Sequence, residues 1–195
     1  MKFSDLDLNK TYSYADYLKW TFDERLELIK GKIFRMTPAP ASNHQRISWT
    51  ISGELYSYLK GKTCQAFSAP FDVRLHKKVS EQNDQQIFTV VQPDICIICD
   101  PSKIDTRGCT GAPDIVVEIL SPGNNQKELR NKYEVYEESG VMEYWIISPQ
   151  DKTFLRYTLV EEGFQPSKLM TIGDIITTPI LPGFELSLEE VFENV

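Results

Sequence analysis

Two acidic residues of this chain lie inside apolar segments, where a charged side chain is costly. Glu118 interrupts the β-branched run from Ile115 to Leu120, and Asp94 follows Pro93 in a second apolar run. A buried carboxylate loses its hydration, so it must be paired with a cation or bound to a metal. If the two strands are neighbours, both carboxylates can bind one hard divalent cation such as Mg²⁺. The ordinary alternatives are an arginine-paired core carboxylate for Glu118 and a turn residue for Asp94.

A basic side chain near these acids is predicted on the helix that follows the Glu118 strand, which we expect to open at Asn124 and end at Gly140. The buried stripe of this helix is formed by Leu129, Tyr133 and Tyr136. Lys132 lies about 65° from the centre of that stripe, so it can lean over the sheet towards Glu118. The alternative is a lysine that merely extends its charged end into water. We interpret the aromatic residues Tyr133, Tyr136, Tyr144 and Trp145 as packing residues.

Glu27 and His44 are two further candidates. Glu27 alternates with Leu26 and Leu28 and so points to the opposite face of its strand. It could be a third metal ligand or act through a water, and an exposed strand glutamate explains it equally well. His44 begins the first long helix, whose positive end favours the neutral imidazole. It could contact a phosphate or a metal-bound water, and a packing or capping role is the alternative.

The four cysteines, at positions 64, 96, 99 and 109, are expected to be reduced thiols. The chain is longer than the small secreted domains that depend on disulfides, and its start lacks the apolar segment of a signal peptide. Cys96 and Cys99 form a C-x-x-C pair, but in a strand a spacing of three directs them to opposite faces. No second such pair exists, so we do not expect a zinc site.

The expected elements are strands interspersed with helices. A short helix after Ser13 precedes two strands over 26–34 joined at a Lys-Gly turn, and a long helix runs from Asn43 to Gly61. Further strands are expected at 63–69, 71–75, 87–98, 113–120, 142–147 and 153–160, with a hairpin tip over 77–86, a loop over 101–111 and a last helix over 188–192. This order predicts an α/β or α+β fold, a mixed β-sheet flanked by helices, in one domain over 1–195.

The composition limits the classes of function. No apolar stretch is long enough to span a membrane, so we expect a cytoplasmic protein without a membrane partner. The net charge of −7 argues against indiscriminate coating of DNA, because phosphate binding normally leaves a basic surface. A bound metal can still supply positive charge locally. Phosphate-binding loop, dinucleotide-binding and serine-hydrolase motifs are absent.

Several motifs together resemble the Uma2 (DUF820) family. They are Pro93-Asp94, the run from Gly111 to Pro122, Lys132-Tyr133 and the run from Glu143 to Ile147. The segments Leu26 to Gly31 and Leu181 to Phe184 also fit, so the resemblance covers nearly the whole chain.

The resemblance implies a PD-(D/E)XK restriction-endonuclease-like fold and a metal-dependent endonuclease that hydrolyses nucleic-acid phosphodiesters, with DNA as the expected substrate. It implies that Asp94 and Glu118 are the two acids of the motif, and we expect them, with the carbonyl of Ile119, to bind Mg²⁺ or Mn²⁺. Glu27 would be a helper acid. The lysine that the superfamily carries two residues after the second acid is missing, because position 120 is leucine. In similar sequences a lysine of the next helix takes that place, and here this residue is Lys132.

Two other hypotheses stay open. The fold could serve as a catalytically silent module that binds nucleic acid or protein, which the acidic net charge and the displaced lysine favour. It could also be an assembly or toxin-like component that works as a homodimer, because symmetric pairs are the commonest soluble oligomers.

Overall fold

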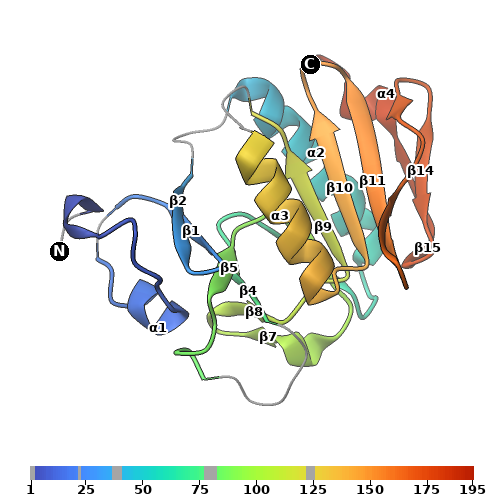
Figure 1. Ribbon diagram of the computed structural model, residues 1–195. Coiled ribbons are helices and arrows are strands. Elements are labelled where there is room, and N and C mark those ends of the chain that lie inside the picture. Colours follow the sequence, from blue (N-terminus) through green and yellow to red (C-terminus); the bar gives the residue numbers. More distant parts are fainter. Residues whose placement is uncertain (1–2, 22, 37–40, 77–82, 122–125) are drawn as a thin grey trace.

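The largest sheet of the protein has the strand order β12-β11-β10-β9-β6-β3, with β13 beside β11. The computed structural model describes residues 3–21, 23–36, 41–76, 83–121 and 126–195 (Figure 1). The strands of this sheet are β3 (Gln65–Ser68), β6 (Ile95–Ile98), β9 (Ile115–Ile119), β10 (Glu143–Ser148), β11 (Thr153–Val160), β12 (Gly163–Pro166) and β13 (Met170–Thr171). Strands β9 and β10 are parallel, whereas β6 and β11 pair antiparallel with them. The expected mixed sheet is therefore confirmed.

The remaining strands of the described residues form two smaller sheets. One has the order β2-β1-β5-β4-β8-β7, and β14 and β15 form the other. Their bounds are β1 (Leu26–Ile29), β2 (Lys32–Arg35), β4 (Val73–Leu75), β5 (Thr89–Val91), β7 (Ile104–Asp105), β8 (Gly108–Thr110), β14 (Ile175–Thr178) and β15 (Leu181–Ser187). The expected Lys-Gly turn joins β1 and β2, and it has positive φ at both Lys30 and Gly31.

Helices α2 (Ser42–Leu59) and α3 (Gln126–Ser139) cover opposite faces of the large sheet (Figure 1). The apolar stripe of α2 packs on Ile115, Val117 and Ile119 of β9, whereas Val135 and Tyr136 of α3 pack on Val116. Strand alternation thus sends successive β9 side chains to different helices. The short helices are η1 (Phe3–Asp5), α1 (Tyr14–Tyr17), η2 (Pro101–Lys103) and α4 (Leu188–Val191). None of the helices in the described ranges is long and apolar enough to cross a membrane.

Some expected elements differ in the structure. The strand expected over 87–98 is two strands, β5 and β6, which belong to different sheets and are separated by Gln92, Pro93 and Asp94. The proline lacks the backbone N–H that a continuous strand would need there. The loop expected over 101–111 contains the β7–β8 hairpin, and α2 begins at Ser42 rather than after Asn43. The hairpin expected around the 77–86 tip is present as the antiparallel pair of β4 and β5, but residues 77–82 of its tip lie outside the described residues, as does the expected helix start at Asn124.

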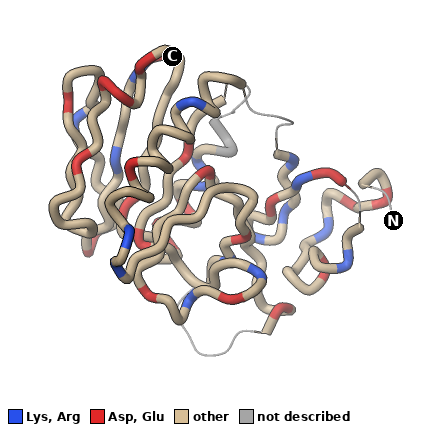
Figure 2. Tube along the Cα trace, turned by 180° about the vertical axis from the view of Figure 1, so that it is seen from behind, with Lys and Arg blue, Asp and Glu red and all other residues tan. Residues whose placement is uncertain are grey.

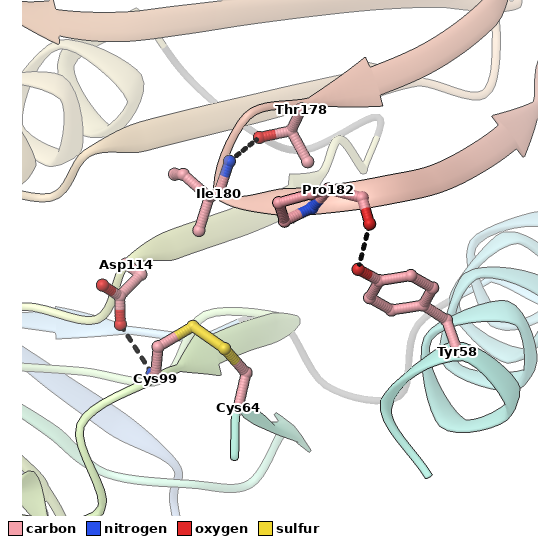
Figure 3. Close-up of a disulfide and its surroundings, with 7 residues drawn as sticks. All are labelled: Tyr58, Cys64, Cys99, Asp114, Thr178, Ile180 and Pro182. Carbon is pink, nitrogen blue, oxygen red and sulfur yellow. Dashed lines mark hydrogen bonds between the residues drawn. A yellow bond between two sulfur atoms is a disulfide. The ribbon is translucent and has the colours of Figure 1, made fainter. Parts of the chain in front are cut away.

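The cysteine prediction was wrong for two of the four residues. Cys64 and Cys99 form a disulfide (Figure 3). The reason is the register of β3 and β6, in which Gln65 pairs with Ile98, so that the residues one step beyond lie opposite each other. Cys96 and Cys109 are buried thiols. The C-x-x-C residues do face opposite sides, since Cys96 belongs to the core under α3 and Cys99 packs against the core under α2.

Candidate active site

Glu118 lies on the face of β9 that α3 covers. It is only 8% exposed. Two side chains of α3 donate hydrogen bonds to its Oε1 atom: the Lys132 ammonium at 2.9 Å and the Tyr136 hydroxyl at 2.7 Å. The contact between Lys132 and Glu118 that helical periodicity predicted is therefore present. Both bonds use the same carboxylate oxygen, Oε1.

Asp94 lies next to Glu118 through the pairing of β6 with β9. Ile95 pairs with Val117 in this antiparallel register, so continuing it by one residue sets Asp94 opposite Glu118. Directly opposite residues have Cβ atoms about 5 Å apart. The Asp94 Oδ2 atom accepts the backbone N–H of Ile119 at 2.7 Å, which holds the carboxylate at the end of the strand.

Glu27 lies beside Lys132 and comes from β1, a strand of the six-stranded sheet. It is 1% exposed, so the exposed alternative considered for this residue is wrong. Its Oε1 atom accepts the backbone N–H of Gln92 at 2.8 Å and lies 3.1 Å from the Lys132 ammonium. Lys132 thus bridges two buried carboxylates that come from different sheets.

The electrostatics of this cluster are dominated by negative charge, because three carboxylates, Glu27, Asp94 and Glu118, share the pocket with one lysine. Burial raises the pKa of Glu118 to about 7; Lys132 opposes this shift, while Asp94 and Glu27 add to it. The pKa of Lys132 is raised well above its ordinary value: burial alone would lower it, but Glu118 and Glu27 outweigh burial. The site therefore keeps a charged lysine and still favours a further cation.

His44 of α2 lies against Asp94, with its Nε2 atom 3.2 Å from Oδ1. Burial lowers the pKa of His44, but Asp94, Glu118 and a hydrogen bond to the backbone of Ile119 together raise it above the ordinary value. The nearby carboxylates thus act against the helix dipole, which favours the neutral imidazole. His44 contacts the groups that were expected to bind the metal.

These residues line one pocket of about 360 Å³. Its lining includes Glu27, His44, Asp94, Glu118, Ile119 and Lys132, which are all the site residues predicted from the sequence. The structure therefore brings every predicted site residue together.

Arg25 and Trp49 also line the pocket, and sequence reasoning missed both. Arg25 is exposed and donates a hydrogen bond of 2.8 Å to Gln92, which in turn donates one of 2.8 Å to Asp72. This chain of contacts holds the guanidinium at the rim. Elsewhere basic residues are scattered among acidic ones in the view of Figure 2.

The donor set fits a hard divalent cation. Asp94, Glu118 and the Ile119 carbonyl offer only oxygen atoms, and Mg²⁺ commonly uses one or two carboxylates and keeps several waters. Among the described residues no group of three His, Cys, Asp or Glu side chains has the geometry of a complete metal cage. Such a cation would therefore rely on backbone, water and substrate oxygens as well.

Comparison with known proteins gives the family. A curated relative, the uncharacterized protein slr1290 of Synechocystis sp. (strain ATCC 27184 / PCC 6803 / Kazusa), is 26% identical over 137 residues, covering 69% of this chain and 67% of the relative. A crystal structure titled as a putative nuclease belonging to DUF820, from Anabaena variabilis ATCC 29413, superposes with a TM-score of 0.73 at 21% identity. The match covers 93% of this chain and 98% of the chain in that crystal structure, and the two chains share the same fold.

The sequence profile of the Uma2 family, described as "Putative restriction endonuclease", matches residues 14–189. This range holds every residue of the pocket cluster as well as both helices that enclose it. The chain belongs to the Uma2 family.

Proposed function

We propose that this protein is a metal-dependent nuclease that hydrolyses phosphodiester bonds of DNA in the pocket around Glu118. The observation that carries the proposal is the meeting of Glu27, Asp94 and Glu118 in one 360 Å³ pocket, where Lys132 pairs with Glu27 and Glu118. Burying three carboxylates is costly, and a protein retains such a cluster where it binds a cation or performs chemistry.

Each residue has a distinct role in this proposal. A divalent cation held by Asp94, Glu118 and the Ile119 carbonyl would polarise a phosphate oxygen and lower the pKa of a bound water. Lys132 fixes the orientation of Glu118 and would stabilise negative charge that grows on the phosphoryl oxygens. Glu27 keeps Lys132 charged and in place as the helper acid.

Arg25 and His44 are the proposed phosphate contacts. The Arg25 guanidinium uses one nitrogen for Gln92 and presents its other donors at the rim. His44 lies on the Asp94 side, where a cationic imidazole could contact a phosphate oxygen.

The test is Mg²⁺-dependent cleavage by Glu118→Gln and Asp94→Asn. Both changes remove a charge and keep the shape of the side chain, so we expect cleavage to be lost while the thermal melt stays close to that of the wild type. Glu54→Gln is the matched control, because Glu54 is an exposed acid on α2 outside the pocket. Cleavage that survives both site variants would rule out this site.

A catalytically silent binding module is the second candidate. The observation that favours it is that both acids already have cationic partners, Lys132 for Glu118 and His44 for Asp94. A panel of single-stranded, duplex and branched DNA and of RNA separates the two. No cleavage of any substrate with Mn²⁺ bound would establish the silent module. We further propose a cytoplasmic homodimer of one domain per chain, which light scattering tests.

A further inference from the structure

Trp49 is the most exposed large apolar side chain in the described part of the chain, at 82%. Isolated exposed apolar residues are normal on protein surfaces. Trp49 differs because it lines the same pocket as Glu118 and Asp94. An indole at the rim of a candidate active site is placed to contact the substrate.

The side of α2 around Trp49 is an extended polar and aromatic stripe. At 100° per residue, Gln45, Trp49, Ser52 and Tyr56 fall within about 60° of one another. This stripe lies beside the buried one that contains His44 and Ile47. Tyr56 is 72% exposed, and the hydroxyl of Ser52 lies 3.1 Å from that of Ser68 at the end of β3. The stripe thus runs from the pocket along the outside of the helix.

We propose that Trp49 is a stacking platform for an unpaired nucleobase, so that the substrate of the pocket is single-stranded or locally unpaired DNA. This inference rests on the proposed function and names its substrate class. Stacking on an aromatic ring is tolerant of base identity, because every base has a π-face, and it is the usual device of proteins that bind single strands.

The charge of the protein favours binding of DNA through base stacking over binding through contacts to many phosphates. A duplex binder neutralises many phosphates with lysine and arginine, but this chain has a net charge of −7 and a rim made largely of serine, glutamine and tryptophan. Base stacking needs none of this positive charge. Arg25 then supplies a contact for one phosphate next to the stacked base.

The depth of the acids supports the same substrate. Glu118 is only 8% exposed, so the bond to be cut must enter the recess. Double-stranded DNA is stiff, with a persistence length of about 150 base pairs, and bending it sharply is costly. A single strand bends freely and can pass from the indole into the pocket.

The experiment measures binding rather than cleavage, so that its failure is distinct from that of the nuclease proposal. Fluorescence anisotropy of a labelled 12-nucleotide thymidine strand is recorded with Ca²⁺ in place of Mg²⁺ for wild type, Trp49→Ala and Trp49→Phe. We expect Trp49→Ala to weaken binding about 5- to 150-fold, the loss of one stacked base. Trp49→Phe keeps a ring and should recover most of the affinity. A strand with abasic sites should bind wild type as weakly as the thymidine strand binds Trp49→Ala.

Equal affinity of wild type and Trp49→Ala for the thymidine strand would overturn the proposal. If that equal affinity came with a shift of Trp49→Ala from dimer to monomer, Trp49 would belong instead to an interface between two copies of the chain. Loss of binding in Trp49→Ala together with normal cleavage by Glu118→Gln would support the platform and reject the proposed catalytic site.

Discussion

Replacing Lys132 by methionine tests the charge balance of the site directly. Methionine fills a similar volume but carries no charge, so Lys132→Met leaves Glu118 and Glu27 without their shared cation. Lys132 is 5% exposed and lies 2.9 and 3.1 Å from the two carboxylates. Removing one partner of a buried ion pair costs about 3–5 kcal/mol. We expect the free energy of unfolding to fall by that amount.

Urea denaturation at pH 8 with a chelator, followed by circular dichroism, measures this loss. The loss should be smaller at pH 6. Burial raises the pKa of Glu118 in the wild type to about 7, and removing Lys132, which opposes that shift, raises it further, so the folded variant takes up a proton at a higher pH than the wild type or the unfolded chain. Protonation removes the unpaired charge, and the variant therefore regains stability as the pH falls towards 7.

Two variants complete the design. Lys168→Met is the matched control, because Lys168 pairs with Asp174 at 3.4 Å while its side chain is 76% exposed, and such pairs contribute about 1 kcal/mol or less. Adding Glu27→Gln to Lys132→Met should restore part of the lost stability by removing one of the two negative charges. A loss below about 1 kcal/mol at pH 8, or one that does not change with pH, would refute this account of the cluster.

Three further predictions concern the surroundings of the pocket. Reducing the Cys64–Cys99 disulfide should lower the free energy of unfolding by about 3–4 kcal/mol, because the bond closes a loop of 35 residues in the unfolded chain; dithiothreitol should then have no effect on a Cys64→Ser, Cys99→Ser variant in urea denaturation. His44→Ala should tighten Mn²⁺ binding measured by calorimetry at pH 6.5, since the raised pKa favours a cationic imidazole against Asp94, and weaker binding would instead make His44 a metal ligand. Tyr136→Phe should cost about 1.5–3 kcal/mol in the same denaturation assay, the contribution of a hydrogen bond to a charged group, and no loss would contradict the 2.7 Å bond to Glu118.

The site was predictable where periodicity decides direction. Alternation along β9 set Glu118 apart from its neighbours, and helical spacing directed Lys132 towards it. Glu27 was harder, because a period of two indicates the face of a strand but not whether another element covers that face. Here Lys132 of α3 and Gln92 cover it.

The remaining features depend on contacts between distant segments. The Cys64–Cys99 bond follows from the β3–β6 register, which no local pattern reveals. The division of the 87–98 segment between two sheets follows from pairings with β1 and β9, although Pro93 was a visible signal. Trp49 could have been found, since it stands on the polar side of the helix that carries His44 and Ile47.

The order of the pocket residues along the chain has a consequence for biosynthesis. Glu27, His44, Asp94 and Glu118 are all translated before Lys132, and α3 must dock on the sheet before the acids gain their counterion. A ribosome-bound chain that ends short of α3 therefore contains the carboxylates without the residue that balances them. Under the proposed function, hydrolytic activity would thus be among the last properties that the nascent protein acquires.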